Sequence, residues 1–257
     1  MALPDRITPI DDYVGKWRAR EPEMEIGELF VPASLRPRFR AWGALLFELR
    51  EAAFELSDAR VIAAKSGWWV EELVALAQGR ARHPVTHALL GPGDPPWTML
   101  ARGLAECAQD DSRPADRDAA LAGMMPLARG IVAMEAALFD GVHDADAERA
   151  VAVHLLLHRL LVGLTAEDAG RVPLSLLARH GVTAAELAGE RGLPVRRDWA
   201  RELAGSLPAR LPRAGLYRRL SLAFDRQRLA RLARRGRLDA GAGPATAWHA
   251  WRAARRG

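Results

Sequence analysis

The hydrophobic positions along this chain recur with the spacing of α-helices and seldom alternate as they do in β-strands. In the first two thirds of the chain, the pattern predicts helices over residues 41–56, 59–78, 97–109, 116–139 and 145–166. Further helices are predicted over residues 174–179, 196–206, 215–236 and 245–256. Segments rich in glycine and proline, such as residues 91–96, separate them as turns. The sequence therefore predicts an all-α protein.

Local signals support several of these boundaries. Asp58 precedes the helix at 59–78 and is a plausible N-cap. Gly181 follows the helix at 174–179 and is expected to adopt the left-handed conformation that ends many helices. Thr183 with Glu186 three residues later matches a capping box, which predicts that another helix begins there.

The organisation of the chain favours one domain over residues 1–257, because no repeat and no compositional break divides it. Residues 1–20 and 240–257 are expected to be peripheral. About half of the residues are hydrophobic (49%), which suffices for a sizeable core. The most apolar stretch, residues 150–166, contains His154, His158 and Arg159 and is shorter than the about 20 residues of a membrane span. We interpret it as a buried core helix.

The chain is basic, with a formal net charge of +5 supplied almost entirely by arginine. This balance favours anionic partners, although an ordinary basic surface would give the same count. Cys107 is the single cysteine, so no internal disulfide can form, and a reducing compartment is expected. The N-terminus lacks the apolar segment of a signal peptide. A cytoplasmic location is therefore expected, with peripheral association at the inner face of the membrane as an option.

Two stretches carry a family resemblance. The first, residues 45–89, contains Ser57-Asp58, Lys65, Trp68-Trp69, Glu71-Glu72-Leu73 and His83-Pro84-Val85. The second, residues 150–182, contains Glu167-Asp168, Gly170-Arg171 and the run Leu176-Leu177-Ala178-Arg179-His180-Gly181. In order and spacing, both stretches resemble the squalene/phytoene synthase family. The resemblance implies an isoprenoid synthase-type bundle around a central cavity, in which two prenyl diphosphates condense head to head.

The resemblance also implies magnesium, held by Asp-x-x-x-Asp motifs on two facing helices, and here this chain departs from the family. Positions 50 and 54, where the first motif should lie, hold Arg50 and Phe54. Position 164 of the second motif holds Leu164, and only Asp168 remains. A single carboxylate is a poor anchor for Mg²⁺, which prefers several oxygen ligands.

Other carboxylates lie close to these positions. Glu51 and Glu55 are spaced i, i+4 and therefore share a helix face, one residue beyond the expected positions. They form either a shifted metal site or, together with Glu48, a solvated acidic stripe. Asp168 beside Glu167 is either a metal ligand or, before a turn, a cap or surface carboxylate. Glu51, Glu55 and Asp168 are thus weak metal candidates.

Two functional hypotheses follow. The first is a non-catalytic or altered squalene/phytoene synthase-like protein, which binds a prenyl diphosphate or another lipid-like ligand or assists assembly through a protein partner. The alternative is an active Mg²⁺-dependent prenyltransferase. In that case Arg50 and Arg171 bind diphosphate directly, and the reduced ligand set is Glu51, Glu55, Glu167 and Asp168. The sequence leaves open whether the protein is an enzyme.

Two further patterns have competing interpretations. His154 and His158 have the i, i+4 spacing of a metal pair but lack a third ligand in the sequence, so a core or cavity-facing pair is expected. Residues 218–237 interleave arginines with leucines. This stretch is either an amphipathic helix for weak contact with anionic membranes, or a solvated face of an arginine-rich protein. Nucleic acid is a less favoured partner for it.

Overall fold

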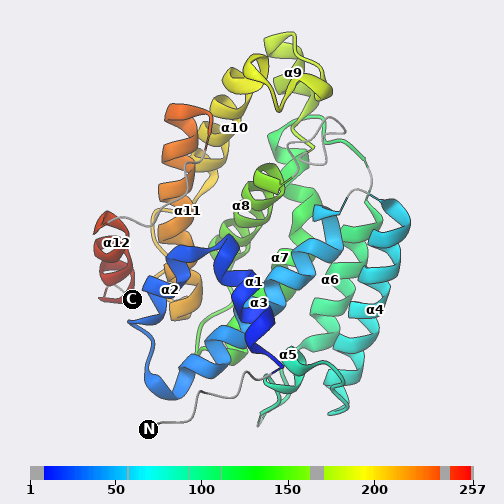
Figure 1. Ribbon diagram of the computed structural model, residues 1–257, viewed down its shortest axis with the longest axis vertical. Coiled ribbons are helices and arrows are strands. Elements are labelled where there is room, and N and C mark those ends of the chain that lie inside the picture. The colour runs from blue at the N-terminus through cyan, green and yellow to red at the C-terminus, as the bar shows by residue number, and fades with distance from the viewer. Residues whose placement is uncertain are drawn as a thin grey trace, which may run out of the picture.

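The computed structural model describes residues 9–56, 58–91, 93–110, 112–162, 171–237 and 244–255. Over these residues the regular structure is helical, which confirms the predicted all-α class (Figure 1). The longer helices are α1 (Asp11–Arg20), α3 (Arg36–Arg50), α4 (Ala59–Ala77), α6 (Trp97–Gln109), α7 (Arg117–Leu138), α8 (Ala145–Val162), α10 (Leu193–Ser206), α11 (Leu216–Arg235) and α12 (Pro244–Arg255). The shorter ones are α2 (Pro22–Glu28), α5 (Pro84–His87) and α9 (Leu174–His180). A π-helix over Glu51–Glu55 continues α3, and 3₁₀ turns span Ala33–Leu35, Ala184–Glu186 and Glu190–Gly192.

The predicted caps are present. The Asp58 side chain accepts a hydrogen bond from the Arg60 backbone N–H at 2.8 Å and begins α4. Gly181 ends α9 in the left-handed region at φ 58°. Thr183 and Glu186 form the expected capping box, but it caps one 3₁₀ turn instead of an α-helix. The backbone at Gly189 is extended and interrupts any longer helix.

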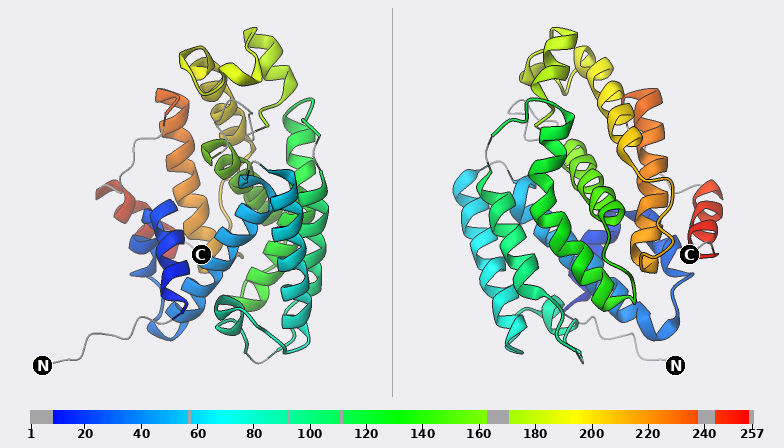
Figure 2. Two further views of the ribbon diagram at one scale, coloured as in Figure 1. Left: turned by 45° about the vertical axis from the view of Figure 1, so that its right-hand side comes forward. Right: turned by 180° about the vertical axis from the view of Figure 1, so that it is seen from behind.

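The long helices form a bundle that α3 crosses obliquely (Figure 1). On one side α7 packs between α6 and α8, and α4 lies against α6; on the other side α10 and α11 pack together and against α8 (Figure 2). By length and composition alone α7 could cross a membrane, but more than half of its apolar window is buried in the bundle. It is a core helix here. The predicted core helix at 145–166 is likewise buried over the part the structure describes, α8.

Helices α6 and α7 approach each other unusually closely. A Cβ atom added at Gly103 of α6 would lie 2.3 Å from the carbonyl oxygen of Pro126 in α7. No side chain fits at that distance, so glycine at position 103 sets how closely the two helices pack.

The expectation that residues 1–20 are peripheral is wrong for α1, because its Trp17 side chain is fully buried. The Trp17 ring lies over Gly43 of α3, where an added Cβ would come within 2.3 Å of it. At the other end of the chain, α12 lies at the edge of the bundle beside α11 (Figures 1 and 2). Its Ala250 and Thr246 are nevertheless buried, and α12 also contacts α2.

Candidate functional site

Arg50, at the end of α3, lies at the centre of a buried ionic network. Its guanidinium group donates to Glu21 Oε1 at 2.6 Å and to His154 Nε2 at 2.7 Å, and its Nε lies 3.7 Å from Glu55 Oε1. Since arginine can only donate, His154 Nε2 must accept. The other ring nitrogen, Nδ1, then donates to Asp225 Oδ2 at 2.9 Å. Arg50 thereby joins the α1–α2 junction, α8 and α11.

A second layer of the network surrounds His158, one turn along α8. Arg228 of α11 donates through Nη1 to His158 Nε2 at 2.9 Å and through Nη2 to Glu23 Oε2 at 2.7 Å. The rings of His154 and His158 lie 4.4 Å apart between their centroids. The network therefore contains carboxylates, guanidinium groups and imidazoles, all taken from water.

The surroundings set the protonation states of two members of this network. Burial alone would raise the pKa of Glu21, but Arg50 and its neighbours outweigh it and lower that pKa to about 2. Glu21 is therefore a carboxylate. For His158, burial and then the nearby Arg50 guanidinium lower the pKa well below its usual value. His158 is therefore neutral near pH 7, which suits its role as an acceptor for Arg228.

Glu21, His154 and His158 could be mistaken for a metal site, because one ligand atom from each lies within 4.8 Å of the others. However, Nε2 of both imidazoles already accepts from a guanidinium group, and Glu21 binds Arg50. A cation would have to displace two positive charges to enter. The prediction that the two histidines form a core pair is confirmed.

The residues at the first expected magnesium motif do not fit the metal. Arg50 brings a positive charge held by Glu21. Phe54 is buried, and the Arg159 guanidinium carbon of α8 lies 5.3 Å from its ring centroid, within the range of a cation–π contact. A guanidinium group and an aromatic ring thus occupy the two positions where the resemblance calls for carboxylates.

The neighbouring glutamates do not form a solvated stripe, because Glu48 and the Glu55 side chain are buried; the shifted metal site stays a prediction. Glu48 is buried and binds Lys65 at 3.0 Å, and Glu51 binds the same ammonium group. The Glu55 side chain is only 3% exposed and faces Arg50 instead. Its burial raises its pKa despite that arginine. Glu51 therefore pairs with Lys65, whereas Glu55 faces Arg50.

The second motif lies largely outside the described residues, which include neither Leu164 nor Glu167 and Asp168. Arg171 is described, and its Nη1 donates to the carbonyl oxygens of Asp110 at 2.8 Å and Ser112 at 3.1 Å. It lines a small cavity of about 180 Å³ together with Arg159. The contacts of Arg50 and Arg171 thus lie in different places, which does not support one diphosphate site shared by the two.

The helix predicted over residues 218–237 is only partly a surface helix, because α11 buries one face while Arg226, Arg234 and Arg235 are exposed; weak contact with anionic membranes stays a prediction. Arg218 donates to both carboxylate oxygens of Glu135, at 2.8 and 2.6 Å, and Trp42 Nε1 donates to the same carboxylate. Arg228 is buried against Glu23. These acidic partners, like Glu21, were missed in the sequence, because they lie far from α11 along the chain and carry no local motif.

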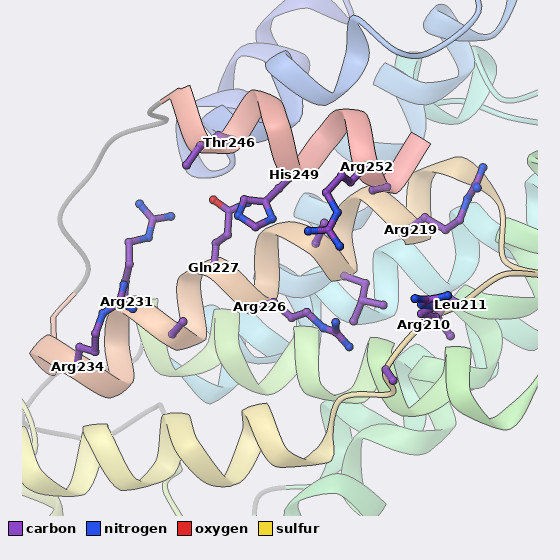
Figure 3. A pocket seen from close by; sticks show the side chains of 16 residues that line it. Arg210, Leu211, Arg219, Arg226, Gln227, Arg231, Arg234, Thr246, His249 and Arg252 are labelled. Carbon is purple, nitrogen blue, oxygen red and sulfur yellow. The ribbon is translucent and has the colours of Figure 1, made fainter. Parts of the chain in front are cut away.

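A larger cavity of about 650 Å³ lies at the edge of the bundle, between α11 and α12 (Figure 3). This position differs from the space between α3 and α8, where the ionic network lies. The cavity is open to solvent and is lined mainly by arginine and alanine side chains.

Comparisons with known proteins agree with this architecture. No family model matches the sequence, and no curated protein matches it either. Among solved structures, a dehydrosqualene synthase crystallised with a ligand superposes with a TM-score of 0.59 at 16% identity, covering 96% of this chain and 97% of that one. The squalene synthase HpnC from Alicyclobacillus acidocaldarius gives a TM-score of 0.52 at 18% identity, covering 88% of this chain and 93% of that one.

These identities are too low to transfer an activity, but the superpositions extend over nearly the whole chain. They agree with the all-α topology and with the two sequence stretches described above. The chain has the squalene/phytoene synthase-like fold.

Proposed function

We propose that this protein has lost head-to-head condensation of prenyl diphosphates and works by binding a prenyl or other lipid-like ligand. The observation that carries the proposal is Arg50, which holds the position of a metal-binding aspartate and is tied to Glu21 and His154 in the interior.

The chemical reason is the charge of the substrate. A departing diphosphate has to be neutralised, and in this fold family the resemblance assigns that task to magnesium held by aspartates. Mg²⁺ takes oxygen ligands in near-octahedral geometry. Arg50 and Phe54 offer none, and Leu164 removes another from the second motif. The side chains at positions 50, 54 and 164 therefore do not fit a magnesium site.

A binding role is supported by the retained fold. The dehydrosqualene synthase to which the chain is similar was crystallised with a ligand, so the architecture can hold small molecules. In this proposal the protein acts in the cytoplasm. A role through a protein partner stays within the same hypothesis of a non-catalytic relative.

Turnover measurements test the loss of activity. We expect the protein, incubated with Mg²⁺ and farnesyl or geranylgeranyl diphosphate, to release no pyrophosphate above a control without enzyme. Extraction should likewise yield no squalene, phytoene or cyclopropyl intermediate. An active squalene synthase in the same assay is the positive control.

Mg²⁺-dependent product would instead establish the alternative, an active prenyltransferase with a reduced ligand set. In that event Glu55→Gln would test whether the carboxylate beside Arg50 takes part. A variant with unchanged turnover would exclude Glu55 from the site.

A further inference from the structure

The groove between α11 and α12 is lined by one face of each helix, and arginine and alanine dominate the lining. From α11 it takes positions spaced by three or four residues, which form one helix face. These are Arg219, Leu222, Ala223, Arg226, Gln227, Ala230, Arg231 and Arg234. From α12 it takes Ala245, Thr246, His249, Arg252 and Ala253, again on one face, and residues 209–211 close one side. Its volume of about 650 Å³ lies within the about 300–1,000 Å³ of small-molecule sites.

The lining is strongly positive. Six arginines contribute to it, and no Asp or Glu does among the residues that the structure describes. Arg231 is bound to Glu23 at 3.2 Å. Figure 3 shows His249 and Arg252 of α12 pointing toward α11, while Gln227 of α11 points toward His249. The two helices therefore present polar groups to the same space.

Two of these arginines, Arg219 and Arg226, have no carboxylate among the causes of their pKa shifts, unlike the arginines of the interior network. Burial lowers the pKa of Arg219 and of Arg226, and no nearby carboxylate in the described structure opposes that effect. The Arg219 Nε is buried without a hydrogen-bond partner, and so is the Gln227 amide nitrogen. Arg226 donates to the Pro208 carbonyl. Arg219 is half-buried, and a partly desolvated cation is costly unless an anion meets it, whereas Arg226 is exposed at the rim of the groove.

The groove also has an apolar surface, which a site for a small inorganic anion would not require. Leu211 and Leu222 lie in it together with alanines from both helices. Apolar surface gains free energy when a hydrocarbon chain covers it. Arginine, in turn, binds phosphate oxygens through its planar fork of donors. The two features together fit a molecule with a phosphate head and an aliphatic chain.

We propose that the groove between α11 and α12 binds a single-chain amphiphile with a phosphate headgroup. The headgroup lies against Arg219 and Arg226, and the first part of the chain lies along Leu222 and Ala223. This inference rests on the proposed binding role, because it names a ligand class and a place for it. The place is separate from the interior position where the resemblance would put a prenyl diphosphate.

Isothermal titration of the full chain with dodecyl phosphate, kept below its micelle concentration, tests the proposal. We expect saturable binding of one molecule per chain. Dodecyl maltoside, which has the chain without the anion, and inorganic phosphate, which has the anion without the chain, should each bind at least about tenfold more weakly.

Three variants locate the site. Arg219→Gln combined with Arg226→Gln should weaken binding at least about tenfold, since two charge-assisted contacts are lost. Ala223→Phe fills the chain position, leaves every charge in place and should weaken binding as well. Arg117→Gln is the matched control, because Arg117 is exposed on α7 and pairs with Asp118; it should bind as the wild type does. Thermal melts by circular dichroism establish that each variant is folded.

Several results would overturn the proposal. These are no saturable binding by the wild type, equal binding by the groove variants, or inorganic phosphate binding as tightly as dodecyl phosphate. Association only with vesicles containing anionic lipid would point to a membrane surface instead of a pocket. The turnover assay tests the proposed function separately. Product formation would contradict the loss of catalysis without affecting the binding result for the groove. Failure of dodecyl phosphate to bind would contradict the groove proposal without restoring catalysis.

Discussion

A single residue, Arg50, changes what the first motif can do. It places a cation where the resemblance calls for a carboxylate, and the cation requires an anion in the interior because burying an unpaired charge is very costly. Glu21, between α1 and α2, supplies that anion at 2.6 Å. The arginine at a position where the resemblance expects an aspartate could be read from the sequence. Its partner could not, because Glu21 lies 29 residues away in a segment without any recognisable motif.

This pairing can be measured by removing one partner and then both. Arg50→Met should destabilise the protein by about 3–5 kcal/mol, because it leaves Glu21 buried and unpaired. Adding Glu21→Leu should recover a large part of that loss, because an apolar pair of similar volume often replaces a buried ion pair at little cost. Urea unfolding of the wild type, the single variant and the double variant gives the three values.

Arg102→Met is the control for this series. Arg102 is 82% exposed and pairs with Glu106 on the surface of α6, so its loss should cost no more than about 1 kcal/mol. A double variant less stable than Arg50→Met alone would show that Glu21 has another stabilising role.

At the scale of elements, the helices with clear caps were predictable and the polar ones were not. Asp58 and Gly181 mark their helices through local hydrogen bonding and backbone conformation, so sequence alone sufficed. Helices α1 and α2 were missed because few of their residues are apolar, although Trp17 and Met24 anchor them in the core. Their burial depends on contacts with α3 and α11, which no local pattern reveals.

The tryptophan pair of α4 offers a prediction at this scale. Trp69 is 2% exposed and its ring centroid lies 4.9 Å from that of His83, whereas Trp68 is 40% exposed. Trp69→Ala should therefore cost about 3–5 kcal/mol, the usual range for a buried aromatic side chain, and Trp68→Ala less than half as much. The two variants are compared by their urea midpoints. Equal midpoints would mean that exposure does not decide their contributions.

At the scale of the whole molecule, the fold was predictable and the composition of its interior was not. The resemblance implies that the two magnesium motifs lie on facing helices, and the contact between Arg50 of α3 and His154 of α8 agrees with that placement. Asp168 of the second motif lies outside the described residues. The sequence pattern showed helices, and the resemblance implied that aspartates are missing at positions 50, 54 and 164. It could not show that charges from four distant segments meet between α3, α8 and α11.

Because this network holds a neutral imidazole, the stability of the whole molecule should fall in mild acid. The pKa of His158 is near 6.5 in the unfolded chain and well below that value in the folded protein, owing to burial and to Arg50, His154 and Arg228. Below pH 6.5 the unfolded state therefore binds a proton that the folded state does not, and stability declines as the pH drops.

Between about pH 7.5 and about pH 5.5, this one group should lower the stability by about 1 kcal/mol. His158→Gln keeps an oxygen acceptor for Arg228 but cannot titrate, so its stability should fall by that much less over the same interval. Glu21 does not interfere, because its contribution is lost only as the pH falls from 4.5 toward about 2. The raised pKa of Glu55 acts in the opposite direction, but it is common to both proteins and cancels in the comparison. The measurement is the free energy of unfolding by urea for both proteins at the two pH values. Equal decreases for the wild type and His158→Gln would mean that His158 takes up its proton without unfolding the network.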